Sequence, residues 1–177
     1  ISILQSALEP GEFDPASDSK VFRISANDYL VATTITELMV RLNEEGPNLD
    51  VRVIDRGINP KKVYRALDTG EIDLAIGAYG DVPERYGVFY IADTDFVCMM
   101  RSGHPLAEGK FTLKRFAQAK HLLVTPGGDA IGFVDEALAR AGLSRRISLT
   151  VNHFSVVPAL IARTDMITTI PRRIART

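Results

Sequence analysis

The sequence predicts an α/β fold made of two Rossmann-like lobes joined by a hinge. Short apolar stretches of strand length alternate along the chain with stretches in which apolar residues recur every three or four positions, as on one face of a helix. The alternation starts again after residues 78–95, and 177 residues are enough for two small lobes. Because strands joined through helices pair in parallel, we expect parallel sheets buried on both faces.

The first lobe is predicted from residues 21–92, after the end of a helix and a linker in residues 1–20. Apolar runs or alternating patterns indicate strands, whereas helices are indicated by apolar spacing, caps and Gly-Pro breakers. In chain order we expect a strand at 21–26, a helix through 31–42 that stops at Gly46-Pro47, a strand at 49–53, a helix from Asn59-Pro60 to Gly70, and a strand at 72–77.

The second lobe is predicted from residues 93–171, and residues 172–177 begin a return toward the first lobe. A strand-like segment at 88–91 precedes it. Thr112 is a favourable helix N-cap, and Gly142 is typical of the end of a helix. In chain order we expect a strand at 96–100, a helix after Thr112, a strand at 121–124, a helix at 133–141, a strand at 147–151, a helix at 154–163 and a strand at 166–170.

Composition narrows the class of protein. Hydrophobic residues make up 46% of the chain and charged residues 24%, which is typical of a globular domain. Lys and Arg number 21 against 22 Asp and Glu, so the chain lacks the basic surplus expected of a domain that grips duplex DNA alone. Any DNA contact must come from another segment. We also expect no membrane span and no signal peptide within the sequence. A leader peptide removed upstream of Ile1 is an alternative that the sequence leaves open.

Ligand-binding residues are expected in three turns that lead from a strand into a helix. Open parallel sheets bind ligands beyond the carboxyl ends of their strands, where helix N-termini can hold a small carboxylate. The three turns are 26–29, 126–130 and 152–154, and their Asn, Asp and His side chains would orient the ligand. We expect these loops, with the one around Gly57, to converge on a shared crevice between two sheets.

Each of these turns also has a purely structural interpretation. Asn27 and Asp28 can be ordinary helix caps, and His153 can cap the helix that Phe154 begins. The glycines of 127–132 can form a tight turn, and they do not match the GxGxxG pattern of a dinucleotide site. His104 and His121 are expected to be structural.

Signatures of catalysis and of metal binding are missing from the sequence. It contains no HExxH, no GxSxG, no P-loop and no cysteine pair with metal spacing. Cys98 is the single cysteine, so it forms no internal disulfide and is interpreted as a small buried hydrophobe, which fits a reducing compartment. We therefore predict a protein without enzymatic activity, cofactor or metal.

Five landmarks together resemble the regulatory domain of LysR-type transcriptional regulators. They are Phe22-Arg23-Ile24, the segment 67–77 (LDTGEIDLAIG), Gly103-His104-Pro105-Leu106-Ala107, the segment 132–143, and Thr169-Ile170-Pro171. Their order and spacing over residues 20–175 make the combination specific. The segments 127–129 and 152–154 are similar to the branch that includes the nodulation and nitroaromatic regulators.

The resemblance implies the type 2 periplasmic-binding-protein fold, with a small-molecule effector between the lobes. The expected effector is an aromatic compound or a small organic acid. The residues that match the family's effector-binding positions are Ala26, Asn27, Asp28, Tyr29, Gly57, Ile58, Gly128, Asp129, Ala130, Asn152, His153 and Phe154.

The resemblance also implies a cytoplasmic homodimer or homotetramer. DNA would be bound only by an N-terminal winged helix-turn-helix domain outside this sequence, and residues 1–8 would be the tail of the connecting helix. In the family, the helix matching 31–45 packs against the helix of a partner that matches 154–163. Alternatively, the apolar residues of both helices simply face their own sheets.

The chain departs from the family pattern in two places. Many members have Ser or Thr where this chain has Asn27-Asp28, and the Asp28 carboxylate would repel an anionic effector unless it is used for capping. The family chain normally passes back into the first lobe after the position of Pro171, whereas this sequence stops at Thr177. We therefore expect an incomplete first lobe with exposed apolar surface.

Two other functions use the same scaffold. A periplasmic-type solute-binding protein shares the two-lobed architecture and is the main alternative to a regulator. The third interpretation is an enzyme lobe of the kind found in some tetrapyrrole-forming enzymes. Cys98 argues against that enzyme, because a thiolate is disfavoured in the apolar interior of a strand.

Overall fold

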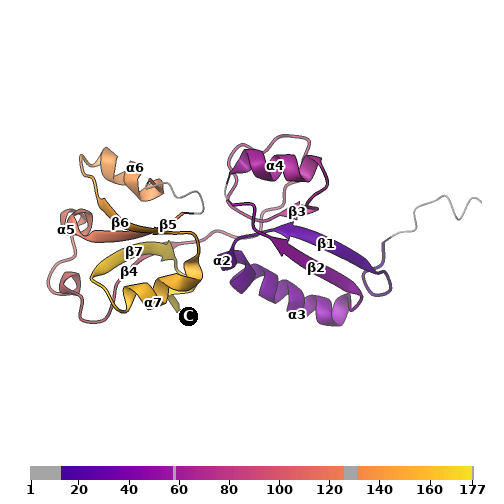
Figure 1. The fold of residues 1–177 in the computed structure, drawn as a ribbon, viewed down its shortest axis with the longest axis horizontal. Coiled ribbons are helices and arrows are strands. Elements are labelled where there is room, and N and C mark those ends of the chain that lie inside the picture. The colour runs from indigo at the N-terminus through magenta and orange to yellow at the C-terminus, as the bar shows by residue number, and fades with distance from the viewer. Residues whose placement is uncertain (1–12, 58, 126–130, 177) are drawn as a thin grey trace, which may run out of the picture.

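The computed structural model describes residues 13–57, 59–125 and 131–176, which form two β-sheets, each covered by helices (Figure 1). We call the two sheets with their helices the first and second lobe. In chain order the elements are β1 (Lys20–Ser25), α2 (Asp28–Leu30), η1 (Val31–Ile35), α3 (Thr36–Glu45), β2 (Leu49–Ile54), α4 (Pro60–Asp68), β3 (Leu74–Ala75), β4 (Phe96–Met99), η2 (Pro105–Ala107), α5 (Leu113–Gln118), β5 (Lys120–Val124), α6 (Phe133–Arg140), β6 (Arg146–Val151), η3 (Phe154–Val156), α7 (Val157–Ile161), β7 (Met166–Pro171) and η4 (Ile174–Arg176).

The first lobe has a parallel sheet in the order β2-β1-β3. Helices α3 and α4 cover its opposite faces (Figure 1). Ile24 and Ile35 are buried on the α3 side, whereas Val63 and Ile72 are buried on the α4 side. The sheet of the first lobe therefore packs against apolar residues on both faces, as expected for a sheet between two helical layers.

One continuous helical segment, residues 28–45, follows β1 and contains a π-helical turn. The Asn27 side chain accepts a hydrogen bond from the Leu30 N–H at 3.0 Å and caps the helix, which begins at Asp28, ahead of the apolar positions 31–42 that predicted it. Residues 31–35 then widen into a π turn, at whose end the Thr36 N–H donates to the Val31 carbonyl. The Thr33 hydroxyl donates to the Tyr29 carbonyl in the same region, which competes with regular helical bonding.

The second lobe has the strand order β4-β7-β5-β6, and the prediction of a wholly parallel sheet is wrong for β4. Strand β4 is antiparallel to β7, with Phe96 opposite Pro171. The Arg172 N–H donates to the Asp95 carbonyl at 2.7 Å, so the chain enters and leaves this strand pair at the same end. The parallel rule fails because it applies to strands joined by a crossover helix, whereas β4 and β7 are distant in sequence.

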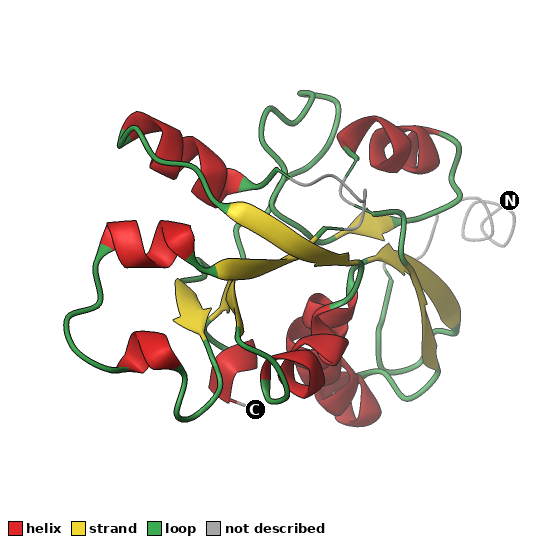
Figure 2. Ribbon diagram, turned by 60° about the vertical axis from the view of Figure 1, so that its left-hand side comes forward, coloured by secondary structure: helices red, strands yellow, loops and turns green. Residues whose placement is uncertain are grey.

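The core of the second lobe is also double-sided. Phe116, Leu138 and Ile167 form a cluster on the side of α5 and α6, and Leu122 and Val157 belong to a cluster on the α7 side. Figure 2 shows the strands as a layer with helices on both sides. Full burial of each such side chain contributes about 1.5–3 kcal/mol, so these two clusters hold the helices onto the sheet.

Three predicted elements differ from the structure. Residues 88–91 form no strand, and Phe89 is 88% exposed. The strand predicted at 72–77 is reduced to Leu74–Ala75, because Ile72 is instead buried against α4. The helix predicted at 154–163 begins as the 3-10 turn η3 and ends at Ile161, with Pro158 in the first turn of α7, where its missing N–H costs least.

Replacing Thr168 by Val should stabilise the protein. Thr168 lies on β7, is fully buried, and its hydroxyl has no hydrogen-bond partner within the described residues. Thr168→Val removes this unpaired polar group with little change of shape, so we expect the free energy of unfolding to rise by about 1 kcal/mol in urea titrations. The matched control is Thr164→Val, whose hydroxyl donates to the Leu160 carbonyl at 2.9 Å. A gain of the same size in both variants would contradict the explanation.

Candidate functional site

The turn between β1 and α2 supplies the first group of candidate residues. Ala26 is buried beneath the turn, and Asn27 occupies the N-cap position with its side chain bonded to the Leu30 N–H. The structural interpretation of Asn27 is therefore correct for its side-chain oxygen. Asp28 is not the cap of this helix, and its carboxylate is available for another contact.

Asp28 forms a hydrogen bond between the two lobes. Its Oδ2 accepts from the Ser155 N–H at 2.8 Å, although the two residues are 127 positions apart in the chain. Its Oδ1 accepts from the Tyr29 N–H at 3.0 Å. The carboxylate therefore links the start of the first-lobe helix to the first turn of η3 in the second lobe.

Aromatic side chains extend this contact between the lobes. The rings of Tyr29 and Phe154 lie 5.9 Å apart between centroids, tilted by 59°. The Tyr29 hydroxyl is hydrogen-bonded to the Thr94 hydroxyl at 3.0 Å, in the segment that leads into the second lobe. We call Asp28, Tyr29, Thr94, Phe154 and Ser155 the interlobe contact. In Figure 1, α2 lies at the boundary between the two lobes.

Asn152 and His153 lie between the end of β6 and η3, next to the interlobe contact in sequence. Both side chains are exposed and make no hydrogen bond within the described parts of the chain. His153 occupies the N-cap position of η3 without bonding through its side chain, so the capping interpretation of its imidazole is wrong. Both side chains are therefore free to contact a ligand.

Gly57 lies in the loop after β2, at the same edge of the sheet as Asn27. Ser25 and Ile54, the last residues of β1 and β2, are paired in parallel, so both following loops leave the sheet on one side. Gly57 has a φ of 70°, a left-handed conformation that glycine adopts without strain, and its N–H donates to the Asp55 side chain at 2.7 Å. No described contact joins Gly57 to the interlobe contact.

The candidates Ile58, Gly128, Asp129 and Ala130 lie outside the described residues.

A buried ion pair holds the start of α6, immediately after residues 126–130. The Asp135 carboxylate accepts from both Nε and Nη2 of Arg145 at 2.8 Å and from the Gly132 N–H at 2.7 Å. The Arg145 side chain is only 1% exposed, and its hydrogen bonds lower the pKa of Asp135. Nothing local in the sequence indicated that Arg145 would be the partner of Asp135.

His121, on the interior strand β5, completes this network. Its Nε2 lies 2.8 Å from the Phe116 carbonyl, and its Nδ1 lies 3.5 Å from Nη1 of Arg145. The ring is fully buried, and burial lowers the pKa of His121, with the positive charge of Arg145 acting in the same direction. His121 therefore has the structural role that the sequence predicted.

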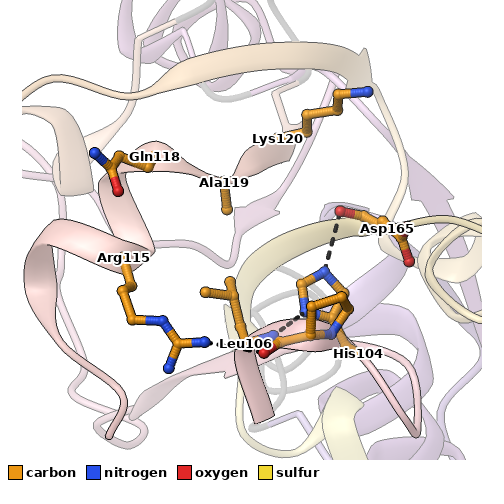
Figure 3. A pocket seen from close by; sticks show the side chains of 8 residues that line it. His104, Leu106, Arg115, Gln118, Ala119, Lys120 and Asp165 are labelled. Atoms are coloured by element: carbon orange, nitrogen blue, oxygen red, sulfur yellow. Dashed lines mark hydrogen bonds between the residues drawn. The ribbon is translucent and has the colours of Figure 1, made fainter. Parts of the chain in front are cut away.

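A shallow depression of about 390 Å³ on the second lobe is not a convincing ligand site (Figure 3). His104 lies in its wall with Nε2 against the Asp165 carbonyl and with Nδ1 accepting from the Leu106 N–H. The Arg115 guanidinium donates to backbone carbonyl oxygens, among them Pro105 at 2.9 Å. These groups fix the turn around η2, so the structural interpretation of His104 is also correct.

The described part of the chain contains no cluster of three His, Cys, Asp or Glu side chains that could hold a metal ion. It also has no helix that is both long enough and apolar enough to cross a membrane.

Comparison with known proteins gives the family of this two-lobed domain. Residues 15–177 match the LysR substrate binding domain family. The chain belongs to this family. Both the predicted LysR family and its type 2 periplasmic-binding-protein fold are confirmed, and the match favours a regulator over a solute-binding protein.

Two regulators and one solved structure illustrate the similarity of this LysR substrate-binding domain. It is 30% identical to the HTH-type transcriptional activator NahR of Pseudomonas putida, covering 97% of the chain and 57% of NahR. It is 28% identical to nodulation protein D 2 of Rhizobium tropici, covering 93% of the chain and 51% of that protein. The structure of the probable transcriptional regulator PA0477 from Pseudomonas aeruginosa has a TM-score of 0.83 at 30% identity, covering 98% of the chain and 58% of PA0477.

The predicted resemblance to the branch with the nodulation regulators is thereby confirmed. The LysR substrate-binding domain spans between half and three fifths of the length of these proteins.

Cys98 should be nearly inert toward alkylating reagents. Burial raises the pKa of the Cys98 thiol to about 11. At pH 8 roughly one thiol in a thousand would be ionised, so we expect iodoacetamide to react roughly 100-fold more slowly than with a cysteine peptide. The rate should rise to the peptide's value in urea. Fast labelling of the folded protein would reopen the interpretation as a cysteine-dependent enzyme lobe.

His121 should make the protein less stable as the solution is acidified from pH 7 to pH 5. Its folded pKa is below the ordinary value of 6.5, so the unfolded chain binds the proton more readily. The stabilisation is present above pH 6.5 and is lost as the pH falls toward the folded pKa. In urea titrations His121→Gln should show a smaller dependence on pH than the wild type, whereas His153→Gln, at an exposed site, should keep it. The same pH dependence of the free energy of unfolding in all three proteins would refute the assignment of this effect to His121.

Proposed function

We propose that this LysR substrate-binding domain senses a small-molecule effector between its two lobes. The interlobe contact supports the proposal most directly, because Asp28, Tyr29 and Phe154 all belong to the predicted ligand-binding turns and meet at the lobe boundary. The neighbouring Asn152 and His153 supply exposed polar side chains that bond to no other described residue, on the second-lobe side. The other candidates, Ala26, Asn27, Gly57, Ile58, Gly128, Asp129 and Ala130, complete the proposed effector site.

The proposed mechanism is a shift between two arrangements of the lobes. An effector changes such an equilibrium only by the difference between its affinities for the two arrangements. The interlobe contact described here consists of two hydrogen bonds and one ring pair, so a ligand that inserts there can replace its interactions at small cost. The lobes would then move as units, since each has its own double-sided core.

In the whole protein this movement would control transcription. The relatives NahR and nodulation protein D 2 are longer than the chain, and NahR is an HTH-type transcriptional activator. We propose a helix-turn-helix domain elsewhere in the protein that contacts DNA, a location in the cytoplasm, and regulation without enzymatic activity or cofactor. The near-neutral charge of the chain supports a DNA contact outside it.

A second copy of the chain is the proposed partner of the outer face of α3. This face carries a depression of about 580 Å³ lined by Val31, Ile35, Met39 and Val40. Met39 is 43% exposed and Val40 is 60% exposed, so the apolar residues of this helix do not all face their own sheet. A partner's η3 and α7, where Val156 is 42% exposed, supply a complementary apolar surface for a homodimer or homotetramer.

Thermal melting tests the proposed effector site. We expect one chemical class among aromatic acids, uncharged phenolics and amino acids to raise the melting temperature, because a ligand at 100 times its Kd stabilises by about 2.7 kcal/mol. Phe154→Ala should abolish the increase, whereas Phe111→Ala, which removes a half-exposed ring on the second lobe, should retain it. Identical ligand responses of the two variants would place the site elsewhere.

Sedimentation tests the proposed dimer. We expect the wild type to sediment at about twice 19.4 kDa and Val40→Glu to shift toward the monomer, because the added charge would be buried in the interface. Leu113→Glu changes a similarly exposed residue on α5 and should leave the dimer unchanged. A monomeric wild type at high concentration would defeat the proposal for this chain.

A further inference from the structure

Among the described residues, only backbone N–H groups bind the Asp28 carboxylate. Its two oxygens accept from the N–H groups of Tyr29 and Ser155, at 3.0 and 2.8 Å. No Arg, Lys or His of the described residues forms an ion pair with it. Charge-assisted hydrogen bonds stabilise this carboxylate at the lobe boundary, and no described cation is paired with it.

Acidic groups accompany this carboxylate at the lobe boundary. Asp93 and Asp95 flank Thr94, the hydrogen-bond partner of Tyr29. Arg56 and Arg172, in the adjoining segments, have acidic partners of their own, since Arg56 is paired with Glu71 at 2.7 Å and Arg172 with Asp95 at 3.4 Å. An incoming anion would thus meet negative charge that neither of these two arginines is free to balance.

We infer that Asp28 is a specificity-determining residue that makes the proposed effector site prefer an uncharged aromatic ligand over an aromatic carboxylate. The inference rests on the proposed function. The Ser155 N–H, a donor that an acid could use, is already bonded to a carboxylate that the chain itself supplies. Because Asp28 is tethered, its effective concentration at Ser155 is in the millimolar range or above, so a free acid competes poorly.

Ring contacts give the site its aromatic character. Tyr29 and Phe154 approach from opposite lobes, and a planar ligand that enters between them gains stacking contacts with both. An amide or hydroxyl group on such a ligand can donate a hydrogen bond to Asp28, which a carboxylate cannot do. The same residue therefore disfavours the acid and favours its uncharged counterpart.

Matched acid and amide probes test this inference on the intact chain. Benzoate and benzamide have the same shape and differ in charge at pH 7, and naphthoate with naphthamide gives a second, larger pair. Calorimetry should show that the wild type binds each amide at least about tenfold more tightly than its acid. Asp28→Ser should reverse the preference by at least a similar factor, because it frees the Ser155 N–H and removes the charge.

Two variants control this experiment. Asp28→Asn keeps the shape and one acceptor oxygen without the charge, so its preference should lie between those of the wild type and Asp28→Ser. Glu37→Gln removes an exposed negative charge from α3 and should retain the wild-type preference. Amide hydrogen exchange at Ser155 supplies a measurement that needs no ligand: it should be at least about tenfold faster in Asp28→Ser than in the wild type.

The possible failures are distinguishable. Equal acid-to-amide ratios in the wild type and in Asp28→Ser would overturn the role of Asp28 while leaving the effector site intact. Absence of binding of all four probes to every variant would overturn the inference together with the proposed aromatic site. Unchanged exchange at Ser155 in Asp28→Ser would show that the hydrogen bond on which the inference depends is not formed in solution.

Discussion

The two lobes are linked by a small contact, in which the Ser155 N–H donates a hydrogen bond to the Asp28 carboxylate beside the Tyr29 and Phe154 rings. It can form because β1 and β6 direct their following turns toward the boundary between the lobes. Asn27 contributes indirectly, because its side chain caps the helix and the Asp28 carboxylate is therefore not needed for capping. Local capping in one lobe thus determines which side chain is available to the other.

Much of this architecture can be predicted from the sequence, because its causes are local. The caps Asn59 and Thr112 lie where their polar side chains and the following apolar spacing indicate helices. The strands with clear alternation, such as 49–54 and 146–151, were likewise predictable. Each of these signals is contained within a few neighbouring residues, so one sequence suffices to detect it.

The remaining features depend on residues that are far apart. The direction of β4 is determined by its pairing with β7, and the burial of Ile72 depends on α4 rather than on a strand pattern. The partners Arg145 of Asp135 and Ser155 of Asp28 could not be predicted from spacing at all. For the candidate site, the sequence therefore predicted the residues of the turns but not their contacts. Asn27 is a cap, His153 is not, and Asp28 joins the lobes.

The π turn at residues 31–35 has a mechanical consequence for the helix that contains it. One additional residue in a turn rotates everything beyond it by about 100° relative to a regular helix. Tyr29, before the insertion, can thus point at the opposite lobe while Met39 and Val40, after it, point outward. The helix is about 27 Å long, and the side chains at its two ends point in different directions around its axis. Any tilt at its base would be carried along its length to the surface proposed for a neighbouring subunit.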